Sequence, residues 1–168
     1  MLGCLAATWG AAIPGAQASA DALSRGLFVE ALEETEWETN PLRQARQRAD
    51  VFYAARDFEA VLETCRAGLE LESGEDPWLL WRSAGSALWL RDGELAAAFA
   101  SRLGGAAADD PDPARAEFWS AQAAAFQEQA EGHLAAAQDR DAAVNRARTA
   151  VAGWALVLVA GAVLWRRV

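Results

Sequence analysis

Few side chains in this chain of 168 residues are of the types that usually carry out catalysis. The one histidine is His133 and the two cysteines are Cys4 and Cys65, so a Ser-His-Asp or Cys-His system would have to use His133. Cys65 lies in an earlier helical segment, far from His133 in the order of elements, and an inert buried thiol is the common state of such a cysteine. We therefore expect no catalytic site and interpret the chain as a protein that is not an enzyme.

Metal and cofactor sites are equally hard to build from these residues. Two cysteines cannot form a multi-cysteine zinc site, and the sequence has neither a histidine pair nor a glycine loop that cradles phosphate. The acidic run at residues 109–113 lacks the spaced oxygen ligands of a calcium site. Carboxylates that start a helix after a loop explain this run better. We expect no cofactor and no metal.

The charge balance excludes a further class of ligand. The chain has 24 acidic residues and 15 basic residues, all of them arginine, and a net charge of -9. Nucleic acid is an unsuitable partner, because phosphate binding needs a dense basic surface. With 53% hydrophobic residues the chain is too apolar to be disordered overall, so a folded domain is expected.

Apolar residues between positions 21 and 148 recur at steps of three and four, the period of an α-helix. We therefore expect helices to position any functional side chain in this region. Alanine, leucine, glutamate and arginine dominate this region, and all of them favour helices. Pro41, Pro77 and Pro113 are 36 residues apart, each where the first turn of a helix tolerates a missing N–H. The sequence therefore predicts an all-α fold built from a helical repeat.

Residues 41–76 align with residues 77–112 in a pattern of small and large side chains. Small residues let two helices approach closely, while large residues fill the space beside them. The paired positions are Ala45 with Trp81, Ala49 with Gly85, Phe52 with Leu88, and Val61 with Ala97.

The segment at residues 56–62, which closes with residues 68–71, resembles the turn and second helix of a tetratricopeptide repeat. The positions Trp119, Ala123, Phe126 and Ala135 continue the pattern as a third unit at an offset of 38 residues. The resemblance covers residues 41–135 and implies about three helical hairpins. A plain helical bundle is the alternative.

The resemblance also implies that the first helix of each hairpin lines a protein-binding groove. The residues expected there are Arg43, Arg46, Asp50, Tyr53, Arg82, Ser86 and Trp89. Arginines beside aromatic rings suit a peptide carboxylate or an acidic extended segment of a partner protein. In the alternative, these arginines pair with the protein's own acids, for instance Arg43 and Arg46 with Glu36 and Glu38.

The first 20 residues have the pattern of a secretory signal peptide. An uncharged, mostly apolar run extends over residues 2–13, and the small residues Ala18 and Ala20 form a cleavage motif before Asp21. An alanine-rich first helix packed on the domain is the alternative, because no basic residue precedes the apolar run. Residues 21–40 are expected to form a capping helix with Leu23, Leu27, Ala31 and Leu32 on its apolar side.

The other end of the chain predicts a membrane anchor. Residues 149–165 carry no charge and, as a helix, would cover about 25 Å, the short limit for crossing a bilayer. Residues 136–148 would form a juxtamembrane helix, and residues 166–168, with two arginines, a cytoplasmic tail. A buried core helix is the alternative for the apolar stretch.

These features favour a membrane-anchored scaffold or assembly factor that mediates protein–protein interactions in the cell envelope. With a signal peptide, it would be a single-pass protein of the bacterial inner membrane with its helical domain in the periplasm. One alternative is a small structural subunit docked in a membrane complex through its span. Another is a cytoplasmic tail-anchored adaptor, if the amino terminus is not cleaved.

Overall fold

The computed structural model describes residues 14–71 and 75–165, and the regular secondary structure of this part is entirely α-helical. The surroundings of side chains are described for residues 18–71 and 75–151. The predicted all-α class is confirmed for this part of the chain. The helices are α1 (Pro14–Ser24), α2 (Phe28–Thr35), α3 (Pro41–Ala54), α4 (Phe58–Leu71), α5 (Pro77–Trp89), α6 (Gly93–Ala108) and α7 (Pro113–Trp165).

The three prolines spaced by 36 residues each begin a helix, as their spacing predicts. The residue before each proline caps the helix with its side chain. Asn40 accepts a hydrogen bond from the N–H of Arg43 at 3.0 Å, and Asp76 accepts one from Leu79 at 2.9 Å. A cap followed by proline satisfies one free N–H and presets the first helical turn. The same local sequence thus sets the start of α3 and α5.

The turns that close the hairpins also repeat. Gly26, Arg56 and Arg91 have positive φ values of 75°, 62° and 61°. After each of them, the next N–H donates to a carbonyl five residues earlier, as from Asp57 to Phe52 at 3.0 Å. This is the Schellman arrangement, in which a residue in the left-handed region ends a helix. It produces three hairpins, namely α1 with α2, α3 with α4, and α5 with α6.

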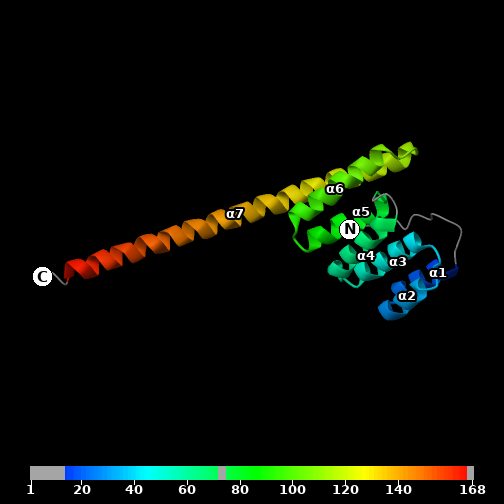
Figure 1. Cartoon of the computed structure of the whole chain (residues 1–168), viewed down its shortest axis with the longest axis horizontal. Coiled ribbons are helices and arrows are strands. Elements are labelled where there is room, and N and C mark those ends of the chain that lie inside the picture. Colours follow the sequence, from blue (N-terminus) through cyan, green and yellow to red (C-terminus); the bar gives the residue numbers. More distant parts are fainter. Residues whose placement is uncertain (1–13, 72–74, 166–168) are drawn as a thin grey trace.

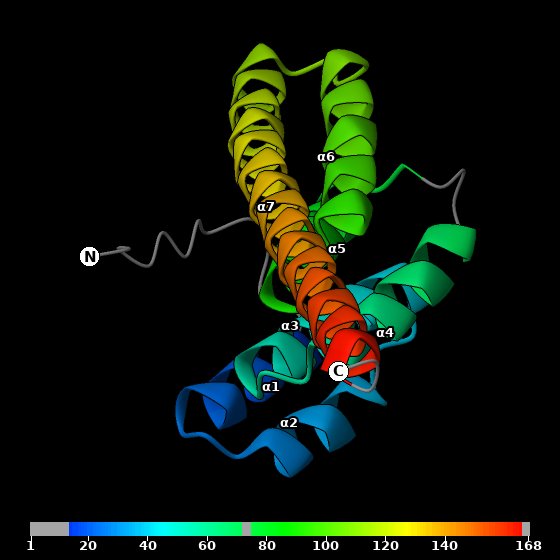
Figure 2. The same cartoon turned by 90° about the vertical axis from the view of Figure 1, so that its left-hand side faces the viewer.

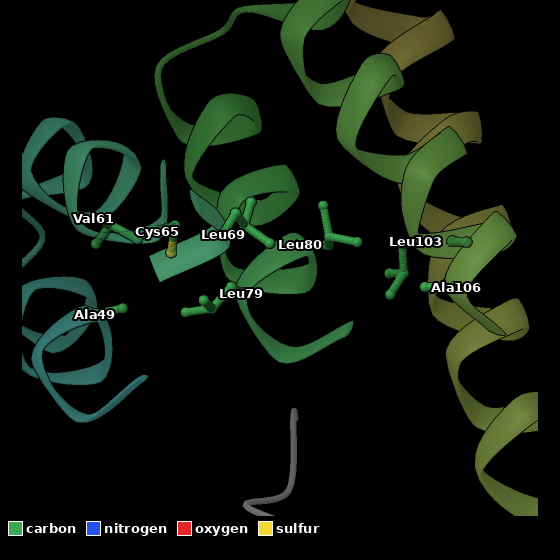
Figure 3. Close-up of a cluster of buried hydrophobic side chains, with 9 residues drawn as sticks. Ala49, Val61, Cys65, Leu69, Leu79, Leu80, Leu103 and Ala106 are labelled. Atoms are coloured by element: carbon green, nitrogen blue, oxygen red, sulfur yellow. The ribbon is translucent and has the colours of Figure 1, made fainter. Parts of the chain in front are cut away.

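The hairpins are stacked in sequence order, from α1 and α2 at one end to α6 and α7 at the other (Figure 2). Helix α5 lies against both α3 and α4, and α7 lies against both α5 and α6. Apolar residues of successive hairpins meet in one core, which contains Ala49, Val61, Cys65, Leu69, Leu79, Leu80, Leu103 and Ala106 (Figure 3). Each hairpin therefore buries its apolar face only with the help of its neighbour, as expected of a repeat stack.

The amino-terminal part of the stack differs from the prediction. Residues 21–40 do not form one capping helix, because Gly26 reverses the chain between α1 and α2. The two helices pack together and against α3 through Ala22, Ala31 and Val51. The amino-terminal cap is thus itself a hairpin.

The predicted third hairpin is also wrong, because α7 continues without interruption from Pro113 to Trp165. This region lacks the left-handed residue followed by a capping aspartate that closes the two preceding hairpins. Gly132 alone does not break the helix. The described stack therefore consists of three hairpins and one long helix, and the first hairpin lies before residue 41.

The two ends of the predicted organisation have different outcomes. Residues 1–13 of the predicted signal peptide lie outside the described residues, whereas residues 14–20 belong to α1. Residues 136–148 are helical, as predicted, and the backbone of residues 149–165 continues α7. The side chains of residues 152–165 lie outside the described part. Within what is described, none of the helices combines the length and apolarity needed to cross a membrane.

Candidate protein-binding face

The first helices of successive hairpins, α3 and α5, lie side by side with α7 on one face of the stack. Asp50 on α3 pairs with Arg82 on α5, and the indole Nε1 of Trp81 donates to Gln122 Oε1 on α7 at 3.1 Å. Trp78 contacts Trp119 one turn earlier on the same two helices. The contacts of α5 with α7 therefore advance together along the chain, as do those of α3 with α5 from Arg46–Asp76 to Asp50–Arg82, so the three helices are parallel. We call this surface the first-helix face.

Arg82 lies at the centre of the first-helix face. Its Nε is 2.6 Å from Asp50 Oδ1, and its guanidinium lies 4.6 Å, 5.2 Å and 4.4 Å from the ring centres of Tyr53, Trp78 and Trp81. Its side chain is only 17% exposed. Stacking on aromatic rings stabilises a partly desolvated guanidinium. Arg82 therefore connects the two neighbouring helices through both its charge and its planar surface.

Burial alters the ionisation of Asp50. Removal of the carboxyl from water raises its pKa above the ordinary value of 3.8, and the charge of Arg82 and its hydrogen bond lower the pKa in part. The desolvation effect is the larger. The carboxylate at this position thus depends on its arginine to remain charged.

A second ion pair joins the same two helices, but here the arginine is on α3 and the aspartate is at the start of α5. The guanidinium of Arg46 on α3 pairs with Asp76, with a distance of 3.1 Å between Nε and Oδ2. The side chain of Asp76 is 2% exposed, and its other oxygen caps α5. Arg46 therefore fixes the carboxylate that starts α5, while 41% of its own side chain stays exposed.

A row of aromatic rings extends from the Arg82 cluster to the edge of the face. The rings of Tyr53 and Phe58 form a T-shaped pair, with centroids 5.5 Å apart and an angle of 74° between the rings. Phe58 stacks on Trp89 at 5.4 Å, with an angle of 1° between the rings. Trp89 nevertheless leaves 61% of its surface exposed, and Leu90 beside it is 40% exposed. Tyr53 and Phe58 are half-buried, so the row ends in one exposed indole, that of Trp89.

The first-helix face thus combines paired ions with the exposed indole of Trp89. No protein-family model, curated protein or solved structure matches this chain. Its chemistry follows from its own side chains. Rigid aromatic groups offer contact area at a low cost in conformational entropy, and bound arginines keep free N–H donors for a second acceptor.

The structure brings together most of the residues predicted for the groove. Asp50, Tyr53 and Arg82 are in direct contact, and Trp89 joins them through Phe58. The remaining predicted residues lie elsewhere. Arg46 contacts Asp76, Arg43 is exposed at the start of α3, and Ser86 is fully buried with its hydroxyl unpaired.

Both central arginines pair with the protein's own acids, which was the alternative considered from the sequence. The acids are Asp76 and Asp50, whereas Glu36 and Glu38 had been expected for Arg43 and Arg46. Sequence reasoning also missed Phe58, Trp78 and Trp81. The spacing of Trp78 and Arg82 by four residues was the available signal, because such positions lie on one side of a helix.

The residues first considered for catalysis lie in separate parts of the structure. Cys65 is fully buried in the main core, and burial raises the pKa of its thiol to about 12, although a hydrogen bond with Ser83 lowers it in part. The Cβ of His133 lies next to Gly93, at the turn between α5 and α6. A thiol with so high a pKa is a poor nucleophile at neutral pH. Among the described residues, there is also no cluster of three or more potential metal ligands of the His, Cys, Asp or Glu type.

Proposed function

We propose that this protein is a membrane-anchored, tetratricopeptide-like scaffold or assembly factor that binds other proteins through the first-helix face. The observation that carries this proposal is the exposure of Trp89 while its ring is held flat on Phe58. Tryptophan is enriched among the residues that dominate protein–protein binding energy. Trp89 also differs from a single exposed side chain, because it stacks on Phe58 and is followed by the exposed Leu90, and contiguous apolar patches mark interaction sites.

The ion pairs refine the expected chemistry of the partner. An acidic segment would have to compete with Asp50 and Asp76 for the two arginines. An apolar or aromatic segment needs no such exchange, since it can pack directly on Trp89 and Leu90. Arg46, whose side chain is 41% exposed, can still donate hydrogen bonds to a terminal carboxylate at the other end of the face. We therefore favour an extended segment with apolar residues, and a carboxy-terminal carboxylate as its only required charge.

The membrane part of the proposal is supported by the sequence. Residues 149–165 are uncharged and are followed by two arginines, a pattern typical of an anchor. Export through the amino-terminal segment would place the domain in the periplasm of a bacterium, with the anchor in the inner membrane. The continuity of α7 supports a direct connection between domain and anchor.

A matched pair of tryptophan variants tests the binding face. Trp37 is 77% exposed and lies between α2 and α3, away from the aromatic row. We expect Trp89→Ala to reduce the amount of partner protein captured from solubilised membranes at least ten-fold, and Trp37→Ala to leave it unchanged. Equal capture by both variants would favour a structural subunit that binds its complex through the anchor.

A further inference from the structure

Helix α7 extends far beyond the stack that supports its first half. Leu134 is the last described residue of α7 that is not exposed, and its Cγ lies 3.0 Å from the position of a Cβ on Gly93. Every residue from Ala135 to Val151 is exposed, a length of about 25 Å. Figure 1 shows this half of the helix standing clear of the other helices. A single helix of this length in water gains little from its own hydrogen bonds and is stabilised mainly by packing.

One side of this exposed segment is apolar. Residues seven apart lie on nearly the same side of a helix, so the alanines and valines between positions 136 and 151 form a continuous stripe. Val144 is 43% exposed and Val151 is 69% exposed. Arg140 is the one charged residue on the stripe. The full set is Ala136, Ala137, Ala143, Val144, Ala147, Ala150 and Val151.

Charged residues border the stripe in a fixed order. Asp139 and Arg146 lie along one edge, and Asp141 and Arg148 along the other. On both edges the arginine is nearer the uncharged residues 149–165, and the aspartate is about 10 Å farther along the axis. An anchored helix therefore presents basic residues next to the membrane and acidic residues above them.

We propose that this stripe docks a membrane-proximal helix of a different membrane protein, one with the opposite charge order. That helix carries acidic residues near the bilayer, opposite Arg146 and Arg148, and basic residues about 10 Å above them. An acidic residue on it also faces Arg140. This proposal rests on the membrane anchor of the proposed function, and it goes further by stating the charge order of the helix that is bound.

A second copy of this chain does not fit the stripe in a shared membrane. Two anchored copies run side by side at the same height, so opposite edges of the two helices meet. Asp139 then faces Asp141 of the other copy, and Arg146 faces Arg148. The two Arg140 side chains also meet. Like charges placed opposite each other destabilise helix pairing and select against such partners.

The experiment uses an exchanged copy of the full chain as the probe for the opposite charge order. This copy carries D139R, R140E, D141R, R146D and R148D. Both the native and the exchanged chains also carry Val144→Cys, as the cross-linking site, and Cys4→Ser. Cys65 stays, because it is buried in the core. The two chains are co-expressed with different tags, and disulfides are formed in isolated membranes by mild oxidation.

We expect the mixed disulfide to exceed the native–native disulfide at least five-fold. Native–native cross-linking equal to the mixed product would show that a second copy occupies the stripe, and would overturn the proposal. Absence of the mixed product, with both chains still in the membrane, would also overturn it while leaving the anchor intact. Release of both chains by an alkaline wash would instead overturn the anchor, and with it this inference.

Discussion

Asp50 on α3 and Arg82 on α5 form an ion pair of 2.6 Å in which the arginine also contacts three aromatic rings. Arg46 and Asp76 form the complementary pair, with the arginine on α3 and the acid at the start of α5. The two pairs cross the same boundary in opposite directions. They join adjacent hairpins, so the charges on the first-helix face contribute to the packing of the stack.

Removal of the guanidinium tests this structural role. Arg82→Ala leaves the Asp50 carboxylate partly buried without its cation, and we expect the free energy of unfolding to fall by about 1–3 kcal/mol. The double variant Asp50→Ala/Arg82→Ala removes both charges and is expected to recover part of this loss. Chemical denaturation followed by circular dichroism measures both values. A double variant less stable than Arg82→Ala would contradict the assignment.

The raised pKa of Asp50 gives a defined dependence of stability on pH. Because burial raises the pKa above 3.8, the folded state keeps this proton to a higher pH than the unfolded chain. The folded state therefore binds more protons in the interval between the two values. The free energy of unfolding contributed by this group falls as pH rises through that interval, and is constant above it.

Asp50→Asn should remove this slope, because the amide does not titrate. The measurement is denaturant unfolding at a series of pH values from 3.5 upward, for the native chain and the variant. The difference between the two curves should decrease with rising pH and then become constant. A difference that increases with pH over the same interval would show that the pKa of Asp50 is lowered in the folded state.

The repeated left-handed turns predict stabilising substitutions. Arg56 and Arg91 adopt φ values of 62° and 61°, a region that costs a residue with a Cβ about 1 kcal/mol relative to glycine. Arg56→Gly and Arg91→Gly should each raise the unfolding free energy by about 0.5–1 kcal/mol. Ala55 is the matched control, because its φ is -72° and glycine there only adds freedom to the unfolded chain. A gain from Ala55→Gly equal to that from Arg56→Gly would contradict the turn argument.

The sequence predicts local structure well where one residue type decides the geometry. Proline with a capping residue before it sets the starts of α3 and α5, and both starts are found where predicted. The prediction of a third hairpin was wrong because a periodic pattern of small and large residues indicates a packed helix face and carries no information about a turn. The turns at Arg56 and Arg91 were not predicted, because the residue in the left-handed region is arginine there and not the glycine that usually indicates such a turn.

The contacts of the candidate protein-binding face were only partly accessible to sequence reasoning. Periodicity places Asp50 and Arg82 on related sides of their helices, but it does not show which acid each arginine reaches. That choice depends on the relative shift of α3 and α5. The contact between Asp50 and Arg82 joins residues 32 apart, whereas the prolines that begin α3 and α5 are 36 residues apart. A shift of one helical turn between neighbouring helices therefore decides the pairs.

The first hairpin predicts where the mature chain begins. Cleavage after Ala20 would cut α1 and remove Ser19, whose buried hydroxyl donates to the carbonyl of Ala31 at 3.1 Å. The four residues left before the turn are too few to form a stable helix, and Ala31 and Val51 would lose part of their cover. We therefore expect that any cleavage accompanying export falls before Pro14, so that the intact mass of the protein from membranes includes residues 14–20. A chain engineered to start at Asp21 should unfold at a lower denaturant concentration, whereas a natural mass that begins at Asp21 would show that the stack does not need α1.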